Sequence, residues 1–316
     1  MLLRGSGRGC RVFVVAAGAA AGASALVAGP SLSFAANPAF SSIIQTGSLQ
    51  NASITEASGI AASRMNPNVL WTHNDSGHPA QIFATTPAGA SLGTYNITGA
   101  ASTDWEDIAV GPGPTPGQQY VYAGDIGDND AVHPSVAVYR IPEPTVSDSV
   151  SVGTVALGGA VRLDFTYPNG PHDAESLFVD PLTKDIYIIS KRDSTKYVYR
   201  AAYPQSTTDP TQMELVISLS NANWITGADI SPDGDEIIMR SYAANSGLMY
   251  IRPAGGTIKQ AFQSTPISIP LASTSSEVQG EAIGFGSVLI ANLLPMRNVL
   301  PRKLYVSPAF FFPGSP

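Results

Sequence analysis

Residues 103–130, TDWEDIAVGPGPTPGQQYVYAGDIGDND, contain two short apolar segments separated by a turn and bordered by carboxylates. Ile108-Ala109-Val110 and Tyr120-Val121-Tyr122 have the composition of β-strands, and the Gly- and Pro-rich sequence between them is typical of a tight turn. The acidic residues around these strands are Asp104, Glu106, Asp107, Asp125, Asp128 and Asp130. The stretch therefore predicts a β-hairpin with concentrated negative charge.

The same pattern recurs along the chain. A polar or acidic pair, an apolar strand, a turn, a second strand, a polar segment and a third strand follow one another in each repeat. The repeats are anchored at Ile60, Ile108, Leu177, Ile230 and Ile283. Apolar segments at 91–99, 160–168, 213–220 and 265–272 supply a fourth strand to the first four repeats. Units of roughly 50 residues with four strands each are typical of β-propeller blades.

The fifth repeat lacks a fourth strand at its C-terminal end. Residues 42–49, SIIQTGSL, precede the first repeat and can complete the last blade, which would close the ring and remove its free edges. We therefore predict an all-β fold, a five-bladed β-propeller over residues 36–316, with blade five imperfect. The predicted blades span about 54–100, 101–168, 169–222, 223–273 and 274–312. A β-sandwich with irregular loops is the alternative, and it explains the repeat poorly.

The first 35 residues have the pattern of a secretory signal peptide. Arg4, Arg8 and Arg11 precede or begin an apolar run that extends to about Gly29, and small residues end it at Ser33-Phe34-Ala35. A retained membrane anchor is the alternative, but a run rich in Ala and Gly inserts weakly. We predict cleavage and an extracellular location. Because Cys10 is the only cysteine, the mature protein would contain no disulfide.

The mature chain would be strongly acidic. Removing three arginines leaves fourteen basic residues against 24 acidic ones, a net charge of −10. Such a chain is unsuited to nucleic acid and to an anionic membrane surface. We expect a monomer whose partner is an extracellular polar ligand.

Polar residues occupy the positions that a propeller places at one mouth of its channel, where the connection into the innermost strand and the loop after the second strand meet. Side chains two residues apart share a side of a strand, so two columns precede the anchors. They are Glu56, Asp104, Asp173, Thr226 and Gln279, four residues before, and Ser58, Glu106, Glu175, Ala228 and Glu281, two residues before. The second-strand loops add His73, Asn74, Asp75, Asp125, Asp128, Asn129, Lys191, Arg192, Arg240 and Tyr242.

Three interpretations of this ring remain open. The simplest is structural: Lys191, Arg192 and Arg240 neutralise neighbouring carboxylates, and water satisfies the other polar groups. The second is a Ca²⁺ site, because clustered carboxylate and amide oxygens suit this cation. Its predicted ligands are Asp104, Asp107, Asp125, Asp128, Asn129 and Asp173. The segment is no EF-hand loop, since Tyr139 stands where a bidentate Glu is needed.

The third interpretation is catalysis. Glu106 and Glu175, on separate blades, could divide acid and base roles across a pocket, as in glycan hydrolases or lyases, with His172 as a further acid or base. Predicted ligand-binding residues are His73, Asn74, Asp75, Lys191, Arg192, Arg240 and Tyr242, with the cationic ones suited to an anionic sugar. No motif here is specific to one reaction.

The linked motifs LWTHNDSG, DWEDIAVGPGP, VYAGDIGDN, HDAESLFVDP and ADISPDG resemble secreted WD40-like β-propeller proteins of actinobacteria and green algae. The resemblance covers roughly residues 50–285 and implies the fold and export, without a specific activity. After Phe285 the chain departs from that pattern, which makes the contribution of blade five to the site doubtful. We predict a secreted propeller whose acidic, Ca²⁺-supported pocket binds or processes an extracellular polar ligand of the carbohydrate class. The alternative is a non-catalytic interaction scaffold.

Overall fold

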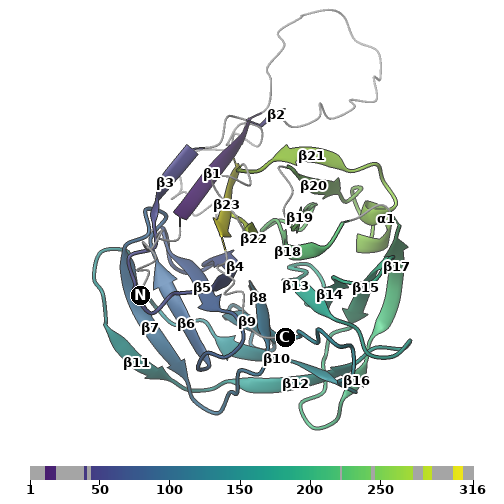
Figure 1. The fold of residues 1–316 in the computed structure, drawn as a ribbon, viewed down its shortest axis with the longest axis horizontal. Helices are drawn as coiled ribbons and strands as arrows, with labels where there is room; N and C mark the ends of the chain where they lie inside the picture. The colour runs from purple at the N-terminus through teal and green to yellow at the C-terminus, as the bar shows by residue number, and fades with distance from the viewer. Residues whose placement is uncertain are drawn as a thin grey trace, which may run out of the picture.

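The computed structural model describes residues 11–18, 39–40, 44–220, 223–242, 246–272, 280–286 and 302–308. Its strands form five sheets arranged around a central axis (Figure 1). The innermost strands contact one another in turn around that axis: β4 (Ala57–Ala62), β8 (Trp105–Pro112), β13 (Ala174–Val179), β18 (Ile225–Ile230) and β22 (Gly280–Phe285). The fold is an all-β propeller, as predicted from the repeat.

Four of these sheets are blades built from consecutive antiparallel strands. Their second strands are β5 (Leu70–Asn74), β9 (Gln119–Asp125), β14 (Ile186–Ser190) and β19 (Glu236–Ser241). Their third strands are β6 (Gln81–Thr85), β10 (Val136–Pro142), β15 (Lys196–Ala201) and β20 (Ser246–Ile251). Their fourth strands are β7 (Ser91–Ile97), β12 (Val161–Thr166), β17 (Glu214–Leu219) and β21 (Ile267–Pro270). The inner strands are buried along almost their whole length, whereas outer strands such as β12 alternate between buried and more exposed residues.

Two short strands link neighbouring blades. β11 (Thr154–Leu157) leaves the second blade and pairs in parallel with β7 of the first, and β16 (Thr211–Gln212) pairs in parallel with β12 of the second. The excursion to β11 accounts for the unusual length of the second repeat. These additions cover outer edges that would otherwise present unpaired backbone groups.

The remaining sheet is assembled from both ends of the chain. Its order is β2 (Ala39–Phe40), β1 (Arg11–Gly18), β23 (Arg302–Pro308) and β22, with β3 (Ile44–Ser48) beside β1. The predicted count of five blades is therefore wrong, since four blades are formed by consecutive strands. The predicted closing strand, represented by β3, pairs with β1 and not with the last repeat. Residues 274–279, 287–301 and 309–312 of the predicted fifth blade lie outside the described residues.

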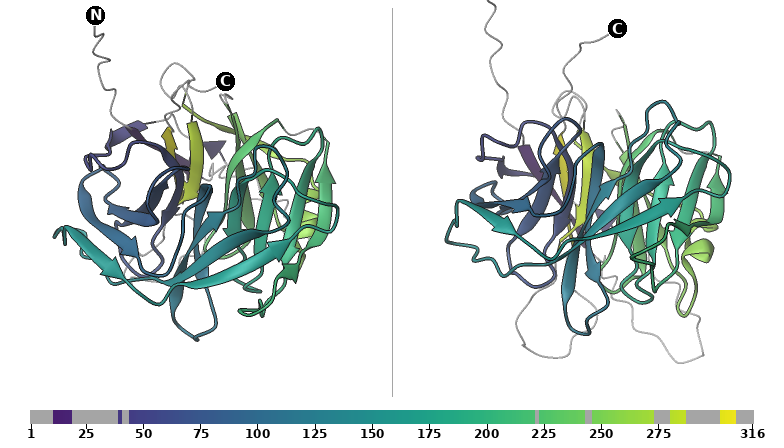
Figure 2. Two further views of the ribbon diagram at one scale, coloured as in Figure 1. Left: turned by 60° about the horizontal axis from the view of Figure 1, so that its bottom comes forward. Right: turned by 90° about the horizontal axis from the view of Figure 1, so that it is seen from below.

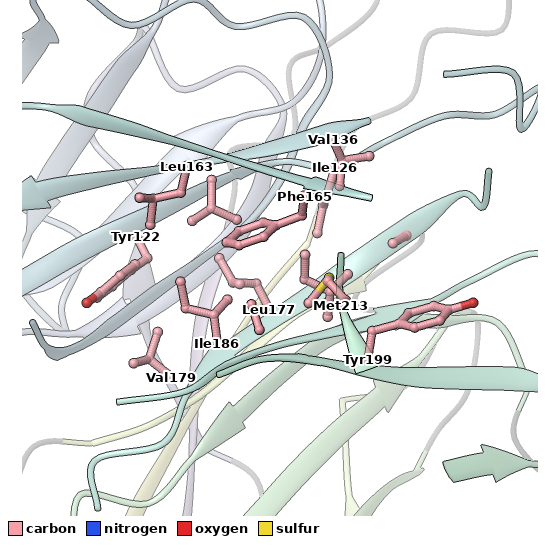
Figure 3. Packing of buried hydrophobic residues seen from close by; sticks show 14 of the residues in the cluster. Tyr122, Ile126, Val136, Leu163, Phe165, Leu177, Val179, Ile186, Tyr199 and Met213 are labelled. Atoms are coloured by element: carbon pink, nitrogen blue, oxygen red, sulfur yellow. The ribbon is translucent and has the colours of Figure 1, made fainter. Parts of the chain in front are cut away.

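Hydrophobic packing between adjacent blades forms the core. Leu163 and Phe165 of the second blade pack with Leu177 and Ile186 of the third, as Figure 3 shows. The sheets are twisted and stand face to face around the axis (Figure 2). A short helix, α1 (Ile258–Phe262), packs on the fourth blade, where Phe262 contacts Tyr250 at a ring-centroid distance of 4.9 Å. In the described part of the chain, no helix has the length and apolar character needed to span a membrane.

A buried carboxylate joins three inner strands within the channel. Asp107 on β8 accepts hydrogen bonds from its neighbour Ile108 N (2.8 Å), from Leu177 N on β13 (2.8 Å) and from Ala228 N on β18 (3.4 Å). Asp229 connects β18 to β22 in the same manner, through Phe285 N at 2.8 Å. These side chains satisfy backbone donors that the strands of a closed ring cannot give to one another.

We expect Asp107→Ala to destabilise the protein by about 3 kcal/mol or more, because the substitution leaves buried N–H groups without an acceptor, at roughly 1–3 kcal/mol each. Urea unfolding of the two forms measures the difference. Asp130→Ala is the matched control: Asp130 is exposed, and its removal should change the free energy of unfolding by no more than about 0.5 kcal/mol. Equal stability of the two variants would contradict this role for Asp107.

Candidate functional site at one channel mouth

Each innermost strand carries a β-bulge near its start. The pairing register between the first and second strands shifts at Ala57/Ile60, Trp105/Asp107, Ala174/Ser176, Ile225/Gly227 and Gly280/Ala282. A bulge inserts an extra residue and redirects its side chain. The residues within the shifts include Ser58, Glu106, Glu175, Thr226 and Glu281. These five side chains form the inner polar ring of the site.

A repeated backbone hydrogen bond defines a second ring above the first. A residue just after the second strand (the first in three blades, the second in the blade of β9) donates its N–H to the carbonyl oxygen of the residue two positions before the bulge. These bonds run from Asp75 to Glu56 (2.9 Å), Gly127 to Asp104 (3.2 Å), Lys191 to Asp173 (2.8 Å) and Tyr242 to Trp224 (2.8 Å). Glu56, Asp104, Asp173 and Trp224 are therefore equivalent positions in four blades.

This equivalence corrects the sequence alignment of the fourth blade. The anchor there is Ala228 and not Ile230, because Ala228 N and Leu177 N both reach Asp107. Thr226 thus belongs with Glu106 in the inner ring, and Trp224 takes the place that Thr226 was given. The error arose because Ala228, at the true anchor position of the strand ITGADI, is small, whereas Ile230 two residues later is large and apolar like the anchors of the other repeats.

Three carboxylates converge at the mouth. Oxygens of Asp75, Asp104 and Glu106 all lie within 4.8 Å of one another. Glycine at position 127 permits this approach, since a Cβ atom there would lie 2.3 Å from Asp104 Oδ2 and 2.5 Å from Glu106 Oε1. These are the residue types and the spacing that a hard divalent cation requires, with oxygen ligands only.

Glu106 is the most confined member of the cluster. It is 4% exposed, and among the described residues no group donates a hydrogen bond to its carboxylate. Burial raises its pKa well above the usual value, and the negative charges of Asp75 and Asp104 raise it further. Burial and neighbouring carboxylates likewise raise the pKa of Asp104 to about 6. Burial raises the pKa of Glu281 to about 7, with Lys191 acting in the opposite direction.

Basic residues occupy the side of the mouth formed by the third and fourth blades. Lys191 forms an ion pair with Glu175, and both side chains are buried. Arg192 Nε lies 2.7 Å from Asp173 Oδ2. Arg240 is buried; it donates to Ala282 O at 3.3 Å and lies against Gly280, where no Cβ would fit. Glu175 therefore differs from Glu106, because its charge is neutralised by a lysine.

The other predicted calcium ligands lie around the cluster and not within it. Asp125 Oδ1 accepts from the N–H of Asp104 at 2.7 Å and so positions that residue. Asp128 Oδ2 accepts from His133 N at 2.7 Å, and Asn129 Oδ1 accepts from Arg192. The Asp173 oxygens contact Asp128 N and Arg192, while both oxygens of Asp107 are occupied by backbone N–H groups inside the channel. Asp75, predicted as ligand-binding, takes the place beside Asp104 instead.

The predicted site residues His73, Asn74 and His172 are held by contacts with other protein groups. His73 is fully buried, its Nδ1 lies 2.8 Å from Asn74 O, and burial lowers its pKa to about 4, so it is neutral at pH 7. Asn74 Oδ1 accepts from the backbone N–H of Thr55 and of Glu56, which fixes the loop. His172 Nδ1 lies 3.0 Å from Asp193 Oδ1, and its ring packs against tyrosines.

Sequence reasoning missed Trp224, which is 45% exposed at the mouth. Its ring lies 6.2 Å from that of Tyr242, with Arg192 positioned over Trp224 at 5.3 Å and Lys191 at 5.9 Å from each ring. A large aromatic residue in an otherwise polar loop was the available signal. The site thus has an acidic half and a cationic, aromatic half.

Comparison with known proteins gives only distant likenesses. No protein-family model matches the chain, and no curated protein matches it. Among solved structures, a nidogen/laminin complex has a TM-score of 0.43 at 8% identity, over 87% of this chain and 82% of that one. A luciferin-regenerating enzyme has a TM-score of 0.39 at 10% identity, over 81% and 92%. An auxiliary nutrient binding protein from Bacteroides thetaiotaomicron has 0.38 at 10%, over 68% of this chain and 42% of that one. These values assign no function.

We expect the thermal midpoint of the chelated protein to fall as the pH rises from 6 to 8. The folded pKa of Glu281 is about 7 against an ordinary value of 4.5, so the folded state holds this proton more tightly than the unfolded chain. Its stabilising contribution is present at low pH and is lost as the pH rises through 7, and Asp104, with a pKa of about 6, acts in the same direction. His73 opposes this trend only below about pH 6.5, because its folded pKa is lowered.

Differential scanning calorimetry in EDTA measures the dependence. Glu281→Gln should reduce the decline between pH 6 and 8. Glu214→Gln, at a side chain that is 62% exposed on the outer strand β17, should leave the decline unchanged. A midpoint that is constant or rises with pH in the unsubstituted protein would refute the prediction.

Proposed function

We propose that this protein is a secreted propeller that binds an extracellular polar ligand, of the carbohydrate class, in a pocket supported by Ca²⁺. The observation that carries the proposal is the buried carboxylate of Glu106, which has no hydrogen-bond donor among the described residues and lies in a cluster with Asp75 and Asp104. A buried charge without a partner is costly, and a cation would remove that cost for Glu106 and the repulsion between it and the two aspartates.

The donor set fits calcium. Asp75, Asp104 and Glu106 offer oxygen ligands only, and Ca²⁺ takes roughly six to eight oxygens in an irregular shell. Three carboxylates leave coordination positions for water or for hydroxyl and carboxylate oxygens of a ligand. A polyhydroxylated ligand could therefore bind through the cation, which is the role we propose for Ca²⁺.

Binding is better supported than catalysis. The pair proposed as acid and base, Glu106 and Glu175, is asymmetric, because Glu175 forms an ion pair with Lys191. The third predicted catalytic residue, His172, contacts Asp193 and a group of tyrosine rings. The pairing of charges also favours the second candidate, a non-catalytic interaction scaffold in which the ring is structural filling.

Secretion is part of the proposal and rests on the pattern of residues 1–35. The structure includes residues 11–18 of that segment as β1, between β23 and β3. Cleavage of a signal peptide would remove β1 and leave the edge of β23 open to another strand. We propose that β3 then pairs with β23 in place of β1, in line with the closing role expected of residues 42–49.

Addition of millimolar Ca²⁺ to chelated protein should raise the thermal midpoint by several degrees. A ligand at about 100 times its dissociation constant stabilises the folded state by roughly 2.7 kcal/mol. Glu106→Gln should raise the midpoint of the chelated protein, because it removes a buried charge, and should abolish the calcium-dependent rise.

Asp104→Asn should also lose the calcium effect, whereas Asp209→Asn, at an exposed turn, should retain it. Isothermal calorimetry with Ca²⁺ alone provides an independent affinity. If neither method detects calcium, the cluster is structural and the scaffold interpretation is left. Turnover of a polysaccharide that disappears in Glu106→Gln would instead establish an enzyme.

A further inference from the structure

A cavity lies in the cationic, aromatic half of the mouth. It has a volume of about 420 Å³, and its walls include Arg192, Lys196, Trp224 and Tyr242. We call Trp224 and Tyr242 the aromatic platform. Trp224 lies two residues before a bulge, at the ring position that Asp104 and Asp173 hold in other blades, so the platform faces the same mouth as the carboxylates.

The chemistry of this cavity is aromatic and cationic. The Arg192 guanidinium has five N–H donors, of which Nε contacts Asp173 and one terminal nitrogen contacts Asn129. Its side chain is 36% exposed, so donors remain for a carboxylate from solution. Lys196 adds a second positive charge to the wall, while the carboxylate of Asp193 is engaged by His172.

The charge of Asp173 links the cavity to the acidic cluster. Arg192 pairs with Asp173, and the charge of Asp173 acts on both Asp75 and Asp104. Lys191 lies over both rings of the platform. A ligand extended across the mouth would therefore meet oxygen ligands for a cation at one end, and an aromatic face with a guanidinium at the other.

We propose that the aromatic platform is a subsite for one residue of an acidic saccharide, such as a uronate, whose ring stacks on Trp224 while its carboxylate pairs with Arg192. The apolar face of a sugar ring carries polarised C–H groups that pack on the negative face of an aromatic ring. Arg presents the planar fork that matches a carboxylate. The inference deepens the proposed function and rests on its choice of a carbohydrate ligand.

The fluorescence of Trp224 can report ligand binding at the platform. The other tryptophans, Trp71 and Trp105, are 0% and 1% exposed, so acrylamide quenches Trp224 selectively. Tetragalacturonate should protect Trp224 from quenching in a saturable manner at a fixed, low Ca²⁺ concentration. The fully methyl-esterified tetramer, which keeps the sugar rings and loses the charges, should protect it much less.

Arg192→Gln should weaken tetragalacturonate binding about tenfold, the loss of one charge-assisted contact. Arg162→Gln is the matched control, because this arginine lies on β12 and pairs with the partly exposed Asp164 at 2.8 Å. Trp224→Phe removes the reporter, so its binding is measured by calorimetry, and blue-shifted emission from Trp71 and Trp105 verifies its fold.

Equal protection by the acidic and the esterified tetramer, or protection by neither, would overturn the acidic subsite. The calcium measurement separates this result from failure of the proposed function. A calcium-dependent midpoint without saccharide protection leaves the cation site and removes the subsite. Protection of Trp224 without any calcium effect supports the subsite and removes the cation.

Discussion

One backbone hydrogen bond determines the architecture of the mouth in each of four blades. It joins a residue in the loop just after the second strand to the carbonyl of the residue two positions before the bulge, as from Lys191 to Asp173 and from Tyr242 to Trp224. Because the bond uses only backbone atoms, it can form whichever side chains the two residues carry. The bulge that follows directs a second residue to the same face. The backbone thus fixes two rings of positions at the mouth, and the residue types at those positions determine the chemistry of the site.

Asp107 and Glu106 are adjacent buried carboxylates on β8, yet their surroundings differ. Asp107 points into the channel, where backbone N–H groups of three strands stabilise its oxygens. Glu106, within the bulge, points to the mouth and receives no such donor. The first carboxylate holds the blades together and contributes to folding. The second lowers stability unless an ion or a proton neutralises it, and such a group is retained more readily for binding than for folding.

The strand repeat was predictable because its signal is carried by many residues, namely the alternation of apolar segments and turns. The site residues were less predictable, because their positions depend on the register of the strand pairing. In the fourth blade, a shift of two residues in the anchor was enough to replace Trp224 with Thr226. The sequence indicated that Lys191 neutralises a carboxylate but not which one, because Lys191 and Glu175 meet through the contact of two strands. The composite sheet escaped prediction because β1 falls in a segment that reads as a signal peptide.

The equivalent positions Glu56, Asp104, Asp173 and Trp224 also explain why the mouth is asymmetric. A ring of identical acidic residues would accumulate repulsion with every blade. Here the charge is divided: Asp104 faces Asp75, Asp173 is neutralised by Arg192, and Trp224 replaces a carboxylate with an aromatic face. An asymmetric mouth can orient an asymmetric ligand, because its ends meet different chemistry. A channel lining that only filled the ring would not require different residue types at equivalent positions. The asymmetry of the mouth is therefore an argument for ligand recognition.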